Sequence, residues 1–161
     1  MAWTTTKSIA AIRGVLRKVK WKFTEKTRGE TTFFTIEKRG ELAAVQAVYQ
    51  PGLFALYLVF GVKPDRKRRA EVIDFANRMN DMAHSGCVVV RDDGKKLAVH
   101  YRASIDHRYV EVLDEGYVGS LIGGAMDMVE TIDVPLARVA KGTSAERAIA
   151  ETLEGGVLPI R

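Results

Sequence analysis

The stretch TTFFTIEKRGELAAVQAVYQPGLFALYLVFGV, residues 31–62, decides the fold. Its Thr- and Phe-rich start, residues 31–38, is typical of a β-strand, and Arg39-Gly40 predicts a turn into a second strand over residues 41–49. Pro51-Gly52 predicts another turn, because proline fixes φ and glycine accepts a positive φ. The apolar run 53–62 then predicts a buried strand, so the whole stretch predicts a three-stranded antiparallel meander.

The residues before this stretch predict one helix and a shorter extended piece. Over residues 7–19, apolar side chains recur every three or four positions and basic ones take the other side, which is typical of an amphipathic helix. A hydroxyl of Thr6 or Ser8 can cap the start of this helix. Residues 21–27 alternate apolar and polar side chains and predict a short strand or an extended approach to the sheet.

The residues after the meander predict a second helix and a hairpin. Pro64 and Asp65 favour a helix start, and an apolar stripe with helical spacing follows over residues 66–84. Residues 86–91 and 95–102 predict two strands, joined by a turn at Asp92-Asp93-Gly94.

The C-terminal third of the chain predicts helices. Residues 109–131 have helical periodicity, and Pro135 is expected to break or restart the helix, leaving residues 134–140 as a separate short piece. Thr143 and Ser144 favour the start of a last helix over residues 145–153.

Together these elements predict an α+β fold, in which helices pack on an antiparallel sheet made of the meander and the hairpin. The expected order is α-β-β-β-α-β-β-α. No repeat or linker divides the chain, so we expect residues 1–161 to form one domain with a core at about 8–140 and a C-terminal helix and tail at 143–161. With 47% hydrophobic and 28% charged residues, the composition is that of a globular protein.

The sequence predicts a protein of the cytoplasm with no membrane partner. The apolar run 53–62 has about half of the roughly 20 residues that a membrane-spanning helix needs. Residues 1–11 contain one basic residue, Lys7, and neither an apolar core nor a cleavage site typical of a secretion signal.

The cysteine and the histidines do not suggest a metal site. Cys87 is the single cysteine, and its apolar strand context predicts a core position. His84, His100 and His107 lack the spacing of a ligand pattern on a helix. We therefore expect no bound metal.

The chain also lacks a recognisable cofactor or catalytic motif. Its glycine cluster has the wrong spacing for a phosphate loop, so we interpret it as a site of close helix packing; the cluster comprises Gly116, Gly119, Gly123 and Gly124. Neighbouring acidic pairs such as Asp92-Asp93 are expected to point apart and do not suggest shared acid–base chemistry. We expect no cofactor and no enzymatic activity.

Aromatic and basic residues leave more than one interpretation open. We interpret the aromatic residues of the predicted strands as core rather than as stacking platforms: Trp21, Phe33, Phe34, Phe54, Tyr57 and Phe60. Residues 1–80 carry 16 Lys and Arg against 7 Asp and Glu, whereas residues 81–161 carry 9 against 13. The basic half could face nucleic acid, an acidic protein or the acidic half of a second copy.

The order of elements and the segment Val72-Ile-Asp-Phe-Ala-Asn77-Arg-Met-Asn80, followed by the strand at 86–90, resemble the YbjN family. These are bacterial proteins labelled sensory transduction regulators, and the likeness covers about residues 8–140. The family is similar in fold to type III secretion chaperones, which commonly dimerise and bind segments of other proteins. The resemblance therefore implies a homodimer with a protein partner and a role in bacterial stress or sensory signalling.

Two binding hypotheses follow. The first is a protein-binding regulator or chaperone-like module whose partner contacts come from Arg66, Lys67, Arg68, Arg69, Asn77 and Asn80. The four cations crowd a helix start, which opposes the helix dipole, so they either serve a partner or form a solvated face beside Asp65 and Glu71. The two asparagines either contact a partner or tie the helix to the sheet. The alternative hypothesis is nucleic-acid binding through the same cations together with Arg13, Arg17 and Lys18.

Overall fold

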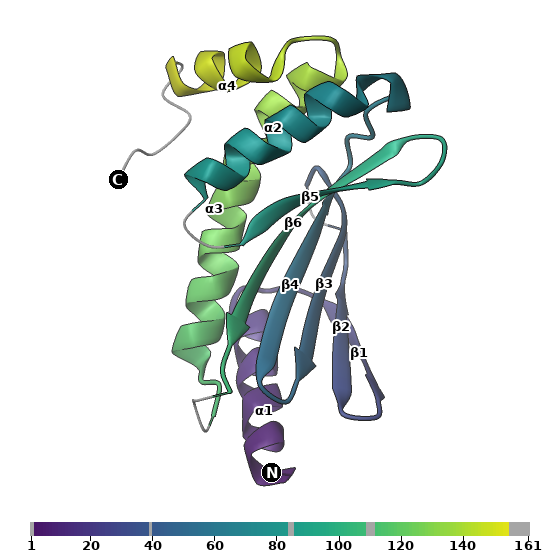
Figure 1. The fold of residues 1–161 in the computed structure, drawn as a ribbon. Helices are drawn as coiled ribbons and strands as arrows, with labels where there is room; N and C mark the ends of the chain where they lie inside the picture. Colours follow the sequence, from purple (N-terminus) through teal and green to yellow (C-terminus); the bar gives the residue numbers. More distant parts are fainter. Residues whose placement is uncertain (1, 39, 84–85, 109–111, 155–161) are drawn as a thin grey trace.

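The computed structural model describes residues 2–38, 40–83, 86–108 and 112–154, with side chains from residue 5 onward. It is an α+β fold in which a six-stranded antiparallel sheet is packed with four α-helices and one short 3-10 helix, η1 (Figure 1). The elements are α1 (Ala2–Lys18), β1 (Phe23–Arg28), β2 (Thr31–Ile36), β3 (Leu42–Gln50), β4 (Leu53–Phe60), η1 (Arg66–Arg68), α2 (Arg69–Met82), β5 (Cys87–Asp92), β6 (Leu97–Asp106), α3 (Glu115–Ala140) and α4 (Ala145–Glu154).

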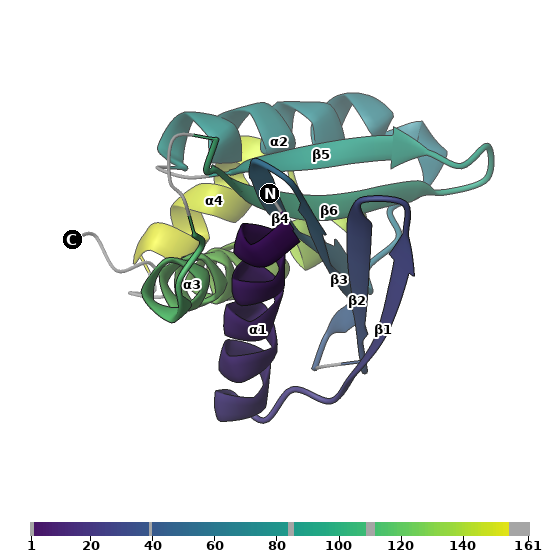
Figure 2. The same ribbon diagram turned by 90° about the horizontal axis from the view of Figure 1, so that it is seen from below.

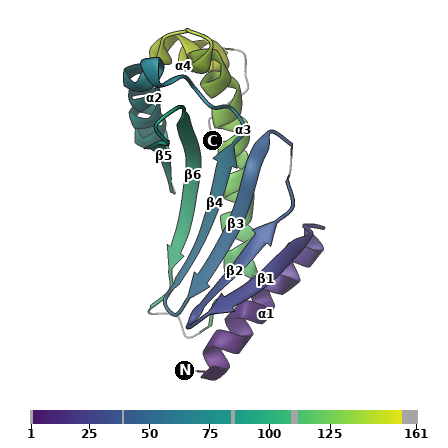
Figure 3. The same ribbon diagram turned by 90° about the vertical axis from the view of Figure 1, so that its right-hand side faces the viewer.

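The sheet has the strand order β1-β2-β3-β4-β6-β5, which Figure 3 shows from β5 at the left to β1 at the right. The first four strands form a continuous meander, and the β5–β6 hairpin joins it through β6, which pairs with β4. β1 and β5 are therefore the two edges of the sheet.

One face of the sheet carries the core. Side chains alternate between faces along a strand, and the set on this face is almost fully buried; its largest members are Phe34, Tyr49, Phe54, Phe60 and Tyr101. α1 and α3 lie side by side against this face, as Figure 2 shows from below. α1 contributes Ile12 and Leu16 to the same core, both with no exposed surface.

α2 and α4 close one end of the molecule. α2 runs along β5 and also packs against α3 and α4. The expected start of this helical region is confirmed, because the Asp65 carboxylate accepts a hydrogen bond from the Lys67 N–H at the beginning of η1. In the part of the chain that the structure describes, no helix has the length and apolar character needed to cross a membrane.

The N-terminal region departs from the expectation in two ways. The piece at 21–27 is a full strand, β1, so the meander has four strands rather than three. α1 begins at Ala2, so neither Thr6 nor Ser8 caps it. Ser8 is buried in the helix, and its Oγ accepts a hydrogen bond from the Leu113 N–H at 3.0 Å. The hydroxyl thus ties α1 to the loop before α3.

The prediction that Pro135 breaks the helix is wrong. α3 is continuous from Glu115 to Ala140 with Pro135 inside it, and the Asp114 carboxylate caps its start. Proline costs a helix one backbone hydrogen bond. Pro135 is buried next to Leu136 and Ile132, and this packing offsets the lost bond. The expected start at residue 109 lies outside the described residues.

The interpretation of the α3 glycines as close-packing sites is also wrong. A Cβ placed at Gly119, Gly123 or Gly124 would meet no atom within 4 Å, and one at Gly116 would meet only the Asp114 carboxylate at 3.2 Å. Nothing else in the described part of this chain approaches these four glycines closely enough to require the missing side chain.

Candidate binding surface

No helix among the described residues covers the second face of the sheet. Its side chains belong to the strand positions that alternate with the buried set, and most of them are half-buried or exposed. We call this surface the open sheet face and define it by Lys26, Phe33, Gln46, Val48, Tyr57, Val59, Val89, Arg91, His100 and Arg102.

The strand register places these residues in three neighbouring rows. One row pairs Lys26 with Phe33 and Phe33 with Val48 across β1, β2 and β3. The next pairs Gln46 with Tyr57 and Tyr57 with Arg102.

The third row of the open sheet face pairs Val59 with His100 and His100 with Val89. Residues opposite each other on one face have Cβ atoms about 4.5–5.5 Å apart. Phe33 is opposite Val48, Tyr57 is the diagonal neighbour of Val48, and Val59 follows Tyr57 on the same face of β4, so these four side chains form one apolar surface. His100 separates Val89 from this surface.

Cations border this apolar surface. The Arg102 guanidinium carbon lies 5.8 Å from the centre of the Tyr57 ring, a cation–π distance. The His100 ring lies 6.3 Å from the Tyr57 ring, and burial, helped by Arg91 and Arg102, lowers the pKa of His100. His100 is therefore held neutral, whereas the arginines give the open sheet face a positive potential.

The two edges of the sheet differ. At β5, the Asn80 side chain accepts a hydrogen bond from the Val88 N–H at 2.6 Å and donates one to the Val88 carbonyl at 3.1 Å. Asn80 thus takes the place that a neighbouring strand would occupy. At β1, Glu25, Lys26 and Arg28 are exposed, and charged residues of this kind commonly protect an open edge.

The structure separates the two predicted asparagines. Asn80 ties α2 to the sheet edge, which supports the structural interpretation of this residue. Asn77 is exposed on α2 and does not share that contact. The two asparagines therefore do not share a structural contact within the chain, and their role in partner binding stays a prediction.

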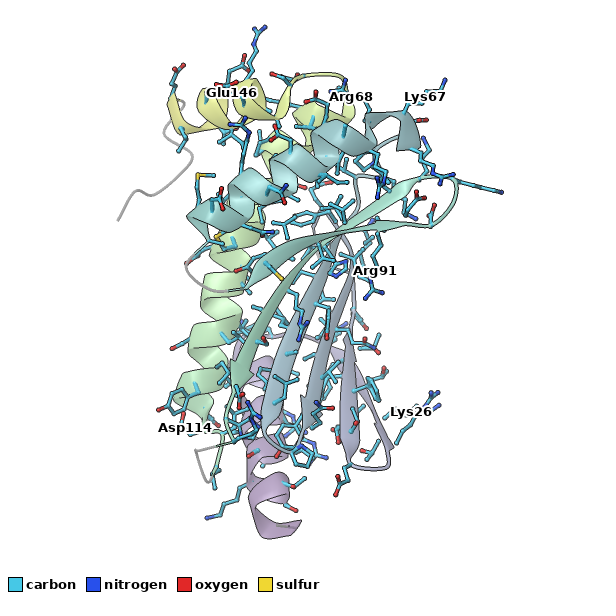
Figure 4. The ribbon with its side chains drawn as sticks, in the orientation of Figure 1. Lys26, Lys67, Arg68, Arg91, Asp114 and Glu146 are labelled. Atoms are coloured by element: carbon cyan, nitrogen blue, oxygen red, sulfur yellow. The ribbon has the colours of Figure 1, made fainter. Side chains whose placement is uncertain are left out.

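The four predicted cations Arg66, Lys67, Arg68 and Arg69 lie at the end of the molecule where α2 begins (Figure 4). The Arg66 Nε donates to the Asp92 carboxylate at 2.7 Å, and the Arg68 Nη2 donates to the Thr143 carbonyl at 2.8 Å. Arg68 is half-buried, whereas Lys67 and Arg69 are exposed. Two of the four cations thus have structural partners within the chain.

The cations of the nucleic-acid hypothesis do not gather on one surface. Arg13 forms a two-pronged ion pair with Glu25 at 2.7 Å, and Lys18 pairs with Glu115. These residues belong to α1, whereas Arg66 and its neighbours lie at the other end of the molecule. The Arg13 guanidinium lowers the pKa of Glu25, as expected for a pair that holds α1 against β1.

The sequence interpretation of the aromatic residues was right for four positions and missed two. Trp21, Phe34, Phe54 and Phe60 are buried in the core. Phe33 and Tyr57 are half-buried on the open sheet face, and Cys87, expected in the core, is half-buried there as well. The apolar run in β4 contains Tyr57 and supplies apolar side chains to both faces, and Phe33 in β2 likewise stands next to the buried Phe34, so the sequence does not show which side chain faces the core.

Comparison with solved structures relates this architecture to one described protein. The crystal structure of "YbjN, a putative transcription regulator from E. coli" aligns with a TM-score of 0.59 at 6% sequence identity, over 92% of this chain and 93% of that chain. The chain has a YbjN-like fold. At this identity the relation concerns the fold alone. No protein-family model matches the sequence, and no curated protein sequence matches it significantly.

The YbjN-like fold extends over nearly the whole length of both chains. The expected α+β architecture is therefore confirmed, and the resemblance noted from the sequence holds at the level of the fold. The further likeness to type III secretion chaperones stays a prediction.

Proposed function

We propose that this chain is a regulatory module without catalytic activity that binds a segment of another protein on its open sheet face. The observation that carries the proposal is a group of neighbouring apolar side chains, Phe33, Val48, Tyr57 and Val59, on a sheet face that no helix of the described residues covers. These side chains are half-buried, and a contiguous, partly exposed apolar surface rimmed by polar residues is typical of a protein-binding site. The YbjN-like fold and the described regulatory role of YbjN are consistent with such a module.

The chemistry of the open sheet face favours a partner that is apolar with acidic flanks. Val48 and Val59 lie on its central strands β3 and β4, and valine offers packing surface without a hydrogen-bonding group. Lys26, Arg91 and Arg102 border the valines and would attract carboxylates of the partner. A second copy of this chain fits the face poorly, because the same cations would meet one another.

Photo-crosslinking from the open sheet face tests this proposal. With p-benzoylphenylalanine in place of Val48, we expect covalent adducts in cells that protease removes and nuclease does not. Val59→Asp places a charge in the third row of the same face and should abolish these adducts while thermal unfolding shows that the fold is retained.

The matched control carries the same photo-reactive residue at Val134, which is exposed on α3. Adducts of equal yield from this position would show unspecific capture and would count against the open sheet face. Adducts from Val48 that persist in the Val59→Asp protein would do the same.

A second candidate function, nucleic-acid binding, is favoured by one observation. Lys26 and Arg102 lie directly across the strands from Phe33 and Tyr57, so cations border two aromatic rings on one surface. Aromatic rings beside cations can stack bases and hold phosphates. Fluorescence anisotropy with labelled single-stranded RNA and duplex DNA separates the two functions, because nucleic-acid affinity would fall steeply with salt and weaken in Arg102→Gln.

We further propose that the chain acts in the cytoplasm as a homodimer. The resemblance to dimeric chaperones motivates this oligomeric state, and the open sheet face remains available in a dimer built on another surface.

A further inference from the structure

A shallow cavity of about 380 Å³ lies where the loop after α1 meets the turn between β2 and β3. Its lining residues are Lys20, Lys22, Glu37, Lys38 and Gly40, and we call it the lysine cavity. No aromatic or aliphatic side chain is among these five, so the cavity offers charge and hydrogen-bond donors rather than apolar surface. It lies beyond the rows that form the open sheet face and is independent of the function proposed above.

Backbone hydrogen bonds fix the walls of the lysine cavity. The Trp21 N–H donates to the Leu16 carbonyl at 2.8 Å, and the Trp21 side chain is buried with 6% of its surface exposed. The Glu37 N–H donates to the Lys22 carbonyl at 3.0 Å, which joins the two walls. Lys20 and Lys22 thus stand on either side of the anchored Trp21, and Lys22 is bonded to Glu37 on the opposite wall.

The backbone of Lys20 is in an unusual conformation. Its φ is +55°, and Lys20 is the one non-glycine residue with a positive φ in the part of the chain that the structure describes. The Lys20 N–H donates to the Arg17 carbonyl, so the residue ends α1 in the left-handed position that helices usually fill with glycine. A lysine here is disfavoured by its own backbone, and residues held in such conformations cluster at functional sites.

The charge of the cavity favours an anion. Three ammonium groups line it against one carboxylate, and the Lys22 Nζ lies 4.0 Å from the nearest Glu37 oxygen, at the limit of an ion pair. One carboxylate can neutralise one of the three cations at most. Lysine ammonium groups act as compact point charges and are common phosphate binders.

We propose that the lysine cavity is a binding site for phosphate groups, with Lys20, Lys22 and Lys38 supplying the charge. A free phosphate and the phosphate of a small organic ester share this chemistry. Titration with inorganic phosphate, pyrophosphate and phosphoserine, followed by the backbone amide resonances of the full chain, separates these sources by their relative affinities. We expect saturable shifts centred on the lining residues Lys20, Lys22, Glu37, Lys38 and Gly40.

Lys20→Gly is the decisive variant, because it changes two properties in opposite directions. Removal of one ammonium group should weaken pyrophosphate binding about 3- to 5-fold, the upper end of what one exposed charge contact contributes. Glycine also relieves the positive φ, so the urea midpoint of unfolding should rise. Weaker binding by a more stable protein cannot come from damage to the fold.

Lys95→Gln serves as the matched control, since it removes one exposed lysine charge from the β5–β6 turn. Pyrophosphate affinity should stay within about twofold of the unchanged protein, because no direct contact is lost. Equal weakening by Lys95→Gln and Lys20→Gly would show general attraction to a basic surface. Amide shifts that do not saturate, or that lie away from the lysine cavity, would also overturn the proposal.

Discussion

At the scale of single residues, Asn80 has a defined structural role, because its side chain joins α2 to the edge strand β5. Its side-chain amide satisfies both the N–H and the carbonyl of Val88 on the side of β5 that faces away from β6. An edge strand with unpaired backbone groups can pair with other chains, so one side chain at this position both joins α2 to the sheet and protects the edge.

Asn80→Ala should therefore lower the free energy of unfolding by about 1–3 kcal/mol, since it leaves two backbone groups of a mostly buried residue unsatisfied. Urea denaturation measures the loss. Asn77→Ala, on the exposed side of the same helix, is the control and should change stability by less than about 0.5 kcal/mol. Equal losses in the two variants would contradict the role assigned to Asn80.

His100 makes stability depend on pH. Burial lowers its pKa below the ordinary value of 6.5, so the unfolded chain binds a proton at a higher pH than the folded chain does. Stability from this residue is present above pH 6.5 and is lost as the pH falls through the lower pKa of the folded state.

We expect the urea midpoint to fall between pH 7 and pH 5, and to fall less in His100→Gln, which cannot be protonated. Hydrogen bonds lower the pKa values of three aspartates, so these carboxylates titrate below pH 5; they are Asp65, Asp92 and Asp106. If the urea midpoint of His100→Gln falls with pH as steeply as that of the unchanged protein, another titratable group causes the pH dependence.

At the scale of elements, α3 combines a proline and four glycines in one continuous helix. Buried residues along one side hold it against the sheet and α1, so tertiary packing overrides weak helix propensity. Gly119, Gly123 and Gly124 face open space in the described part of this chain, so no packing contact requires a glycine at these positions.

Gly119→Ala and Gly123→Ala should each stabilise the protein by about 0.5–1 kcal/mol, because alanine is the better helix former and a Cβ meets no atom there. Thermal unfolding measures the gain. Gly61→Ala is the opposite control, since its Cβ would lie 2.5 Å from the Glu41 carbonyl oxygen and should destabilise the fold. A loss of stability at Gly119 would indicate a contact with another molecule.

Elements with a strong hydrophobic period or a distinct turn were predicted well from the sequence. Elements with mostly exposed residues, or with a proline inside a helical pattern, were not. The central meander and the hairpin were predicted because their turns and apolar runs are distinct. β1 was seen only as a possible strand, since Glu25, Lys26 and Arg28 at an exposed edge leave little hydrophobic pattern. Pro135 misled the prediction because its cost is offset by burial, which depends on distant residues.

The candidate site was less accessible from sequence than the fold. Which face of β4 the helices cover depends on where α1 and α3 pack, so apolar residues on the open sheet face resemble core residues. The bond between Asn80 and Val88 likewise requires the orientation of α2. The lysine cavity joins Lys20 and Lys22 to Glu37, Lys38 and Gly40, and the pairing of β1 with β2 brings these residues together.

At the scale of the whole molecule, charge and apolar surface are distributed in a way that bears on oligomeric state. Light scattering coupled to size exclusion should give a mass of about twice the 17.9 kDa of the chain if the proposed homodimer forms. We expect this dimer to persist at high salt and in Tyr57→Asp, because the cations of the open sheet face disfavour self-association there. A monomer at all salt concentrations would contradict the homodimer.

The unequal edges of the sheet have a consequence for assembly. Strand-by-strand growth into a fibre requires that each added molecule offer a second pairable edge to the next one. Here α2 already fills that place at Val88, and β1 is left as the accessible edge. We therefore expect any association by strand pairing to stop after one addition. The protein should form a dimer through β1 at most, and no open-ended polymer.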